Sequence, residues 1–161
     1  MSEKPVLKVD LQRADVTERV SRDSSLFRSP LVDTLGSEWR EVFKRGHAKR
    51  AAARVVLFQQ GDEGDSLLFV LSGAVRLFAR KASDTVELGV AHPGDVIGEA
   101  AGAEGRRAMS AVANELVEFV ELPRAVLQEA GAAEALERWL SALHSERLKA
   151  LDEMTDFLNR W

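Results

Sequence analysis

The sequence contains no cysteine, and this absence excludes disulfide bonds, zinc–thiolate sites and catalysis by a thiol. No run of apolar residues reaches the ~18 that a membrane-spanning helix needs. The N-terminus is charged and has no apolar core of signal-peptide length. From these absences we expect a cytoplasmic protein that does not insert into a membrane.

Clustered metal ligands and catalytic pairs are absent as well. His47, His92 and His144 are far apart, and no other ligand type gathers beside any of them. The sequence shows no nucleophile–base pair and no redox motif. We therefore expect a binding protein rather than an enzyme, with no metal and no resident cofactor.

The composition is that of a soluble globular domain, with 45% hydrophobic and 30% charged residues. A chain of 161 residues supports one core and rarely divides into two domains. The net charge is −4, yet basic residues gather at Lys44, Arg45, Lys49, Arg50 and Arg54. This cluster is either a nucleic-acid patch or a solvated helix end and turn. The second interpretation is favoured, because no aromatic residues interleave the charges and the whole chain is acidic.

We expect residues 1–30 to form an N-terminal extension and residues 31–161 to form one domain. Within the extension, residues 6–11 suit a strand, and residues 15–18 resemble a capping box that opens a short helix. The serines, Asp23 and Pro30 of residues 22–30 are typical of a linker and turn.

Between residues 53 and 122, short apolar or alternating runs are separated by turn residues, and this spacing predicts a β-sandwich, barrel or jelly roll. The expected strands are 54–58, 67–71, 74–80, 85–90, 95–97, 108–113 and 116–122. A helix capped by Ser37 is expected to precede them and to run to about Arg45. Two helices are expected to follow, one opened by Pro123 and ended by Gly131, the other over 133–161.

The last expected helix carries an apolar stripe with coiled-coil spacing, interrupted at Arg147 and Ala150. The stripe consists of Leu136, Leu140, Leu143, Met154, Phe157 and Trp161. At 1.5 Å per residue the helix would be about 44 Å long, more than a small β-roll covers. Burial on its own domain is one interpretation. A homodimer through this helix is favoured, with Arg147 reaching outward to Glu146 or Asp152 of the other copy.

Two motifs carry the most specific information. Residues 61–73 read Gly-Asp-Glu-Gly-Asp-Ser-Leu-Leu-Phe-Val-Leu-Ser-Gly, a turn that enters an apolar strand. Residues 98–110 read Gly-Glu-Ala-Ala-Gly-Ala-Glu-Gly-Arg-Arg-Ala-Met-Ser, a loop of small residues between a carboxylate and two arginines. Such a loop offers backbone N–H groups and a guanidinium to a phosphate, and a carboxylate to sugar hydroxyls.

Together the two motifs resemble the cyclic-nucleotide-binding domain family, of the catabolite-activator and kinase regulatory-subunit type, over about residues 31–160. The resemblance implies an α+β, mainly β fold. Its core would be a β-roll or jelly roll of seven or eight antiparallel strands, with N-terminal helices and two C-terminal helices, the last one long. It also implies a sensor that signals through those helices to an unidentified protein. Because the chain stops at Trp161 without a helix-turn-helix, we expect a stand-alone domain that does not bind DNA directly.

Residues 98–110 lie where the family places its phosphate-binding cassette. By resemblance, Glu99 accepts the ribose 2′-hydroxyl and Arg107 pairs with the cyclic phosphate. Arg106 is left open as an alternative phosphate contact, since the family often has proline at that position. The expected ligand contacts are Gly98, Glu99, Ala100, Arg107, Ala108 and Ser110.

The cassette also departs from the family pattern. Residues 100–102 are small where bulky apolar anchors are usual, the loop is about one residue short, and Met109 is large. These departures support an alternative function, a ligand-free domain of the same fold that acts in dimerisation or protein interaction. Ala108 lacks the hydroxyl that guanine-preferring members often carry, so cyclic AMP is favoured over cyclic GMP.

Overall fold

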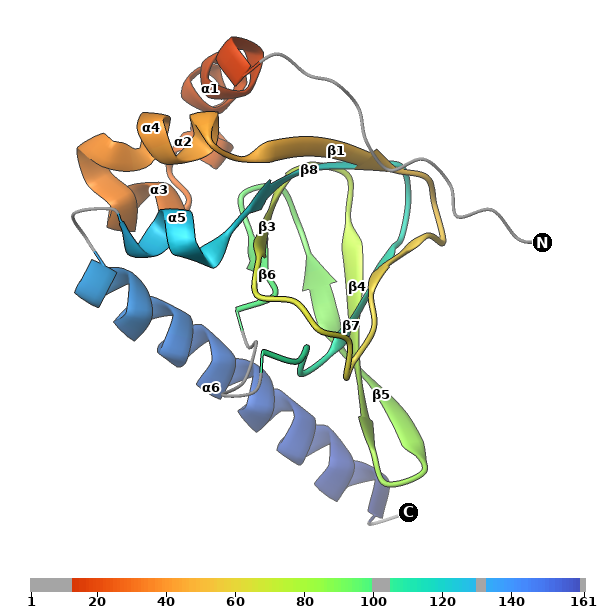
Figure 1. Ribbon diagram of the computed structural model, residues 1–161. Helices are drawn as coiled ribbons and strands as arrows, with labels where there is room; N and C mark the ends of the chain where they lie inside the picture. Colours follow the sequence, from red (N-terminus) through yellow and green to blue (C-terminus); the bar gives the residue numbers. More distant parts are fainter. Residues whose placement is uncertain (1–12, 100–104, 130–132, 160–161) are drawn as a thin grey trace.

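The computed structural model describes residues 13–99, 105–129 and 133–159, with side chains described between Val16 and Glu153. Figure 1 shows helices gathered at one end of a β-roll and a long last helix that runs beside it. The helices are α1 (Arg13–Arg22), α2 (Ser24–Phe27), α3 (Pro30–Leu35), the 3-10 turn η1 (Gly36–Glu38), α4 (Trp39–Lys44), α5 (Arg124–Gln128) and α6 (Ala133–Asn159).

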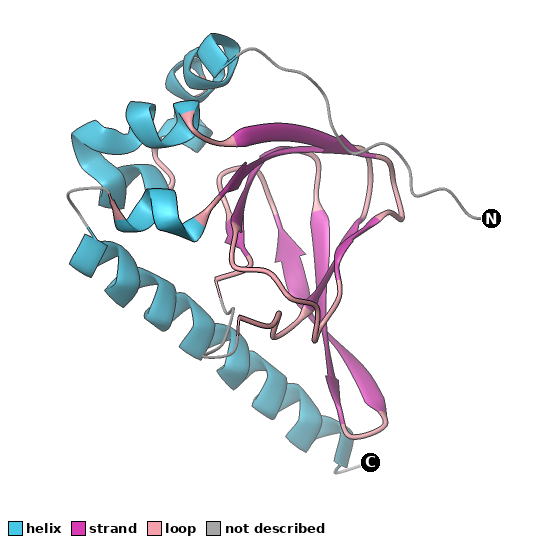
Figure 2. Ribbon diagram, in the orientation of Figure 1, coloured by secondary structure: helices cyan, strands magenta, loops and turns pink. Residues whose placement is uncertain are grey.

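Two four-stranded sheets form the roll, in the orders β1-β8-β3-β6 and β2-β7-β4-β5 (Figure 2). The strands are β1 (His47–Ala51), β2 (Val56–Phe58), β3 (Leu67–Ser72), β4 (Val75–Lys81), β5 (Asp84–Ala91), β6 (Val96–Ile97), β7 (Ser110–Ala113) and β8 (Val117–Leu122). Each described pairing is antiparallel. The predicted fold, a mainly β roll of seven or eight antiparallel strands with flanking helices, is confirmed.

The central strand β3 separates two hydrophobic clusters, because alternate side chains of a strand point to opposite faces. Leu67, Phe69 and Leu71 pack against the helices. Leu68 and Val70 face the inside of the roll. Both faces of β3 are therefore covered, which explains why this strand is a continuous apolar run.

The helical layer packs on the outer face of β3 through aromatic contacts. The ring of Phe43 meets that of Phe69 edge-on at 5.0 Å, and Trp39 meets Phe43 at 6.0 Å. Leu136 and Leu140 of α6 are buried in the same cluster. The first half of the α6 stripe therefore packs on its own domain. The helix also contacts β5, so the roll extends further along α6 than the sequence indicated.

Several helix boundaries differ from the predictions. Ser37 lies inside η1 and α4 begins at Trp39, while α1 begins before residues 15–18. The stretch expected as linker contains two helix caps. The Asp23 carboxylate accepts hydrogen bonds from the backbone N–H groups of Ser25 and Leu26. Ser29 Oγ accepts a hydrogen bond from Val32 N at 3.2 Å. Serine, aspartate and proline favour turns and helix starts alike, so their presence did not distinguish the two.

Parts of the N-terminal segment belong to the hydrophobic core. Val16, Val20 and Leu26 are buried in the cluster that includes β3. The expected boundary at residue 31 stays a prediction, as does the strand over residues 6–11, which lies outside the described residues. Pro123 is the N-cap of α5 rather than its first residue.

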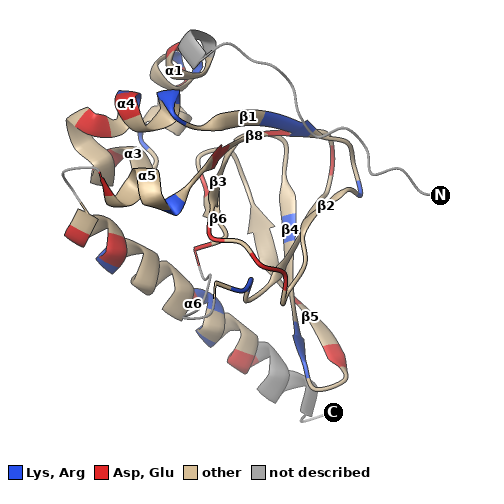
Figure 3. Ribbon diagram, viewed as in Figure 1, with Lys and Arg blue, Asp and Glu red and all other residues tan. Residues whose placement is uncertain are grey.

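The first strand, β1, was not predicted. Residues expected to be a helix end and turn instead pair along β8, and basic β1 lies beside acidic β8 (Figure 3). Lys49 Nζ donates to Glu121 Oε2 at 2.9 Å, and Arg50 to Glu118 at 3.4 Å. Cross-strand charge pairs thus explain part of the basic cluster. Arg54, expected in the first strand, has a φ of 72° and lies in the turn after β1.

Glu118 ties the N-terminal helix to the sheet. Arg19 Nη1 and Ser72 Oγ both donate to its Oε1 at 3.2 Å, and Arg50 donates to its Oε2. Burial of the carboxylate acts to raise its pKa. The hydrogen bonds of these partners, with the charge of Arg19, act more strongly, so the pKa of Glu118 lies below its ordinary value.

This network predicts an acid-sensitive contribution to stability. With a folded-state pKa below that of the unfolded chain, ionised Glu118 adds stability above about pH 4.3, which is lost as pH falls through the folded-state pKa. We expect Glu118→Gln to lower the free energy of unfolding at neutral pH by about 1 kcal/mol and to weaken its acid dependence. Denaturant unfolding from neutral pH down to about pH 3 measures both. Exposed Glu115→Gln is the control, and an unchanged acid dependence in Glu118→Gln would contradict the prediction.

Candidate functional site

The two sequence motifs lie against each other. Gly64 N donates to Gly105 O at 2.9 Å, and Arg107 N donates to Asp62 O at 2.7 Å. Gly61 N donates in return to Arg107 O at 2.8 Å. The turn before β3 therefore fixes the backbone of residues 105–107, the end of the cassette.

The guanidinium of Arg107 lies in a tight slot between the two motifs, and the side chain is buried. Its Nη1 donates to Ser66 O at 2.7 Å and to Gly98 O at 3.3 Å, and its Nη2 donates to Ser66 Oγ at 3.1 Å. The Phe58 ring centre lies 4.5 Å from the guanidinium carbon. These contacts hold the arginine in one orientation.

Two glycines form the walls of this slot. A Cβ on Gly64 would lie 2.8 Å from Arg107 Nε. A Cβ on Gly98 would lie 2.5 Å from Arg107 Nη1 and 2.9 Å from Ser66 O, and Gly98 has a φ of +86°. Glycine is required at Gly98 both for its backbone conformation and for the close approach of the guanidinium.

The electrostatics of Arg107 are those of a buried cation. Burial lowers its pKa from the ordinary value, while the surrounding carboxylates act in the opposite direction. An arginine guanidinium nevertheless stays protonated in proteins. Within the described residues, no carboxylate oxygen lies within ion-pair distance of it. Its described hydrogen-bond acceptors are all neutral carbonyl or hydroxyl oxygens.

Glu99 is the other buried charge of the site, and its side chain is fully buried. Its Oε2 accepts a hydrogen bond from Arg147 Nη1 of α6, and Arg147 Nη2 donates to Val96 O at 2.9 Å. Arg124 of α5 donates to the Glu99 carbonyl at 2.9 Å. Glu99 Oε1 is buried and has no hydrogen-bond partner among the residues that the structure describes. Both C-terminal helices thus contact the same residue of the cassette.

The expected outward direction of Arg147 is therefore wrong. Arg147 points to Glu99 of its own domain, because a buried carboxylate needs a compensating charge. Asp152, expected to pair across a dimer, makes an ion pair of 3.0 Å with Lys81 in the same chain.

Comparison with known protein families supplies the identification. The family model described as the cyclic nucleotide-binding domain matches residues 48–133. The chain belongs to this family. No curated protein is similar enough to this chain to be matched to it.

Solved structures share the fold of this cyclic nucleotide-binding domain. The Thermus thermophilus catabolite activator protein is 28% identical, with a TM-score of 0.60 over 84% of this chain and 63% of its own. The regulatory domain of Toxoplasma gondii PKA, crystallised with cAMP, is 25% identical, with a TM-score of 0.66 over 77% of this chain and 48% of its own. This chain thus spans about half the length of the kinase regulatory chain. Because the family is one of ligand-binding domains, we describe the chain as a binding domain rather than an enzyme.

A third structure carries a different ligand. It is the regulatory subunit of a cAMP-independent protein kinase A from Trypanosoma cruzi bound to guanosine. At 21% identity and a TM-score of 0.63, over 76% of this chain and 46% of that one, it shows a shared fold alone.

The remaining expected contacts of the cyclic nucleotide-binding domain lie at different depths. Arg106 is exposed and donates to Gly61 O at 3.0 Å, whereas Arg107 is buried. Ala108 is half-buried, and Ser110 Oγ accepts from Gln60 N at 2.9 Å. Ala100 lies outside the described residues. Of the two arginines, Arg107 is the one enclosed by both motifs.

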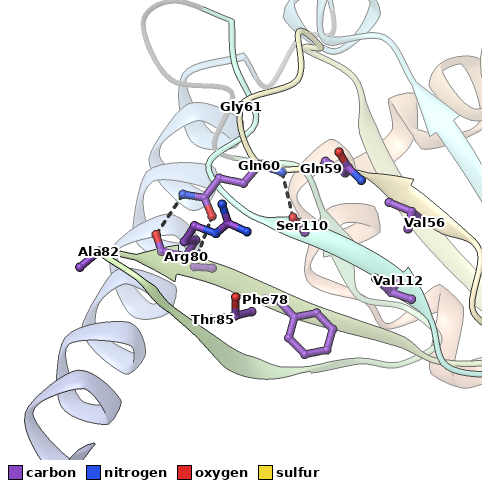
Figure 4. A pocket seen from close by; sticks show the side chains of 11 residues that line it. Val56, Gln59, Gln60, Gly61, Phe78, Arg80, Ala82, Thr85, Ser110 and Val112 are labelled. Carbon is purple, nitrogen blue, oxygen red and sulfur yellow. Dashed lines mark hydrogen bonds between the residues drawn. The ribbon is translucent and has the colours of Figure 1, made fainter. Parts of the chain in front are cut away.

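An open pocket of about 790 Å³ lies beside the β4–β5 hairpin (Figure 4). The side chain of Gln60 spans its rim and bonds the backbone of Arg80 twice, accepting from its N–H at 2.7 Å and donating to its carbonyl at 3.3 Å. Ser110 lines this pocket, but neither Glu99 nor Arg107 does. The pocket is therefore separate from the cassette charges.

Several residues of the site were not identified from the sequence. Ser66, Phe58 and Gly64 surround Arg107. The motif over residues 61–73 contains Gly64 and Ser66, but it did not indicate that they contact the arginine. Arg124 and Arg147 are single basic residues in helical segments, with no local pattern that marks them. Among the described residues, no helix has the length and hydropathy to cross a membrane, and no metal-ligating side chains cluster.

Proposed function

We propose that this domain is a sensor that binds a cyclic nucleotide at the cassette, residues 98–110, with Arg107 on the phosphate and Glu99 on the ribose. The observation that carries the proposal is the buried guanidinium of Arg107, which has no carboxylate partner among the described residues. A buried cation that no carboxylate contacts is costly, and a cyclic phosphodiester would bring a negative charge into direct contact with it. The proposed contacts are Gly98, Glu99, Ala100, Arg107, Ala108 and Ser110.

The geometry also bears on the alternative of a ligand-free domain. In such a domain the two buried charges of the cassette could neutralise each other. In this structure Glu99 pairs with Arg147 instead, and Arg107 bonds only neutral acceptors in the described part of the chain. This arrangement favours the sensor over a ligand-free interaction module.

Cyclic AMP is the proposed ligand. Ala108 has no hydroxyl with which to meet a guanine amino group. The resemblance to the Toxoplasma gondii regulatory domain, which was crystallised with cAMP, also supports it. The guanosine-bound relative from Trypanosoma cruzi makes a direct comparison of nucleotides necessary.

Isothermal titration calorimetry with cyclic AMP and cyclic GMP tests the proposal. We expect one site per chain and tighter binding of cyclic AMP. Absence of binding at millimolar concentrations of both nucleotides would overturn the sensor and leave the ligand-free interaction module. Tighter binding of cyclic GMP would overturn only the preference.

The output of the sensor is proposed to pass through α6 to a downstream protein, in the cytoplasm and without direct contact to DNA. Arg147 and Arg124 connect Glu99 to both C-terminal helices. A ligand can shift the position of these helices only by as much as it prefers one position over the other. A ligand bound at Glu99 would act on these two contacts and so favour one position of the C-terminal helices over another.

A homodimer through α6 stays part of the proposal, but the structure restricts it. Leu136 and Leu140 of the predicted stripe are buried on their own domain, whereas Leu148, which is not part of that stripe, is 45% exposed on α6. We expect light scattering at micromolar concentration to give about twice the 17.7 kDa chain mass. Leu148→Glu should then give a folded monomer, because a charge at an apolar interface is poorly tolerated.

Leu116→Glu is the matched control for the dimer, since Leu116 is also exposed but lies between β7 and β8. It should leave the oligomeric state unchanged. A wild-type protein that is monomeric at every concentration tested would contradict the homodimer and leave α6 as an internal element only.

A further inference from the structure

The sheet β2-β7-β4-β5 has an outer face that carries apolar side chains, where an antiparallel sheet more often presents polar ones to water. The strand register places one residue of each strand in a single row across this face, namely Val56, Val112, Arg76 and Val90. Val56 is 43% exposed and Val90 is 38% exposed, and Phe78 in the next row is half-buried. This face therefore offers apolar surface on which a ligand can pack.

The open pocket of about 790 Å³ lies on part of this face and differs in character from one end to the other. Val56, Phe78 and Val112 lie toward one end, and Arg80 lies toward the other, beside the β4–β5 hairpin (Figure 4). The side chain of Gln60 bonds the backbone of Arg80 at 2.7 and 3.3 Å, which fixes the rim at the cationic end. The pocket is therefore preformed, with an apolar floor and a guanidinium at one end.

Two arginines of β4 lie on this face, and within the described part of the chain only one of them has an acidic partner. Arg76 forms two hydrogen bonds with Glu87, at 2.9 and 3.1 Å, and its guanidinium lies over the Phe78 ring at 5.0 Å. Arg80 is exposed, and no carboxylate of the described residues lies within ion-pair distance of its guanidinium. It is also the one charged residue among the described residues that line the pocket. Its single charge is therefore available to a monoanion that enters the pocket.

We propose that this pocket is a second ligand site, separate from the cassette, for a planar aromatic carboxylate. The rings of the ligand pack on Val56, Phe78 and Val112, since aromatic rings gain from contact with another ring and with apolar side chains. The carboxylate pairs with Arg80, because a guanidinium can bind a carboxylate through two parallel hydrogen bonds. A rigid, planar body loses little conformational freedom on binding, which favours it in an open pocket. The buried charges of the cassette do not line the pocket, so the proposal does not depend on cyclic nucleotide binding.

Titration of the wild-type protein with 2-naphthoate, followed by the NMR shifts of its backbone amides, tests where such a ligand binds. We expect saturable binding at millimolar concentrations or below, with the largest shifts at Thr85, Ser110 and Val112. Largest shifts within residues 98–107 would place the probe at the cassette and overturn the proposal. Absence of saturable binding at several millimolar would overturn it as well.

The uncharged analogue 2-naphthalenemethanol isolates the contribution of the carboxylate. Arg80→Met should weaken the binding of 2-naphthoate about fivefold and leave that of the alcohol within about twofold, because only the acid pairs with the guanidinium. Arg138→Met is the matched control, since Arg138 is an exposed arginine of α6, and it should leave both affinities unchanged. Equal losses for the acid and the alcohol in Arg80→Met, or no loss for either, would overturn the proposal.

Val56→Ser tests the apolar floor of the pocket. Val56 is 43% exposed, so the variant should fold normally. We expect it to bind the acid and the alcohol about threefold more weakly, because both probes lose apolar contact. Leu116→Ser is the control, since Leu116 is 56% exposed and lies away from the pocket, between β7 and β8. Unchanged affinities in Val56→Ser, or equal losses in Leu116→Ser, would overturn the proposed placement of the rings and with it the site.

Discussion

Replacing Arg107 with alanine should weaken cyclic AMP binding by about 30-fold to 1000-fold, equivalent to ~2–4 kcal/mol. The guanidinium is the buried cation of the cassette, and its loss removes a charge-assisted, two-pronged donor to the phosphate. Because the same side chain also bonds Ser66 and Gly98, the free protein should lose stability as well. Calorimetry for binding and thermal unfolding without ligand separate the two effects.

Arg106→Ala is the matched control, since Arg106 is adjacent, equally charged and exposed. We expect the affinity of this variant for cyclic AMP to stay within about threefold of that of the wild type, because an exposed charge at the edge of a site contributes little. If Arg106→Ala proves damaging and Arg107→Ala does not, Arg106 holds the phosphate and the assignment is wrong. Relative to Arg107→Ala, the variant Arg107→Lys should recover more of the thermal stability than of the affinity for cyclic AMP. An ammonium group cannot reproduce the two-pronged hydrogen bonding of a guanidinium.

Gly98→Ala should abolish measurable binding while the β-roll still folds. The added Cβ would lie 2.5 Å from Arg107 Nη1 and 2.9 Å from the Ser66 carbonyl, so the guanidinium must leave its slot. The φ of +86° adds backbone strain of about 1–2 kcal/mol. We expect the affinity for cyclic AMP to fall at least about 100-fold, since both the clash of the Cβ and the backbone strain act on the residue next to Glu99.

Gly61→Ala separates the strain from the clash. Gly61 has a similar φ of +91°, but a Cβ there would meet nothing within 4 Å. This variant should lose a comparable amount of thermal stability and keep most of its affinity. Equal affinities of Gly98→Ala and Gly61→Ala would show that the slot around Arg107 is not needed for binding.

The fold was largely predictable from the sequence because its determinants are local. Alternating apolar runs between turn residues predicted β3, β4, β5 and β8 within a residue or two of their observed ends. The glycines of residues 61–73 marked the turn before β3. The strand β1 was missed, because its sequence, His-Ala-Lys-Arg-Ala, has no apolar alternation and the acids of β8 that pair with Lys49 and Arg50 are distant in the chain.

The candidate site was only partly predictable. Glu99 and Arg107 stood out because a carboxylate and an arginine bracket a loop of small residues. Which of the two adjacent arginines enters the slot depends on the register with which residues 105–107 pair with the preceding turn. A shift of this register by one residue would bury Arg106 and expose Arg107. No local sequence pattern specifies the register.

By itself, the sequence determined the class of fold, the order of most of its strands and the two motifs over residues 61–73 and 98–110, since periodicity and turn chemistry act over a few residues. Only the tertiary structure decided that Arg147 turns inward to Glu99, that α6 packs on its own roll, and that Arg107 lies buried without an acidic partner among the described residues. These are contacts between segments far apart in the chain. Their physical cause is the need of buried charges and apolar faces for partners, and which partners are available depends on the completed fold.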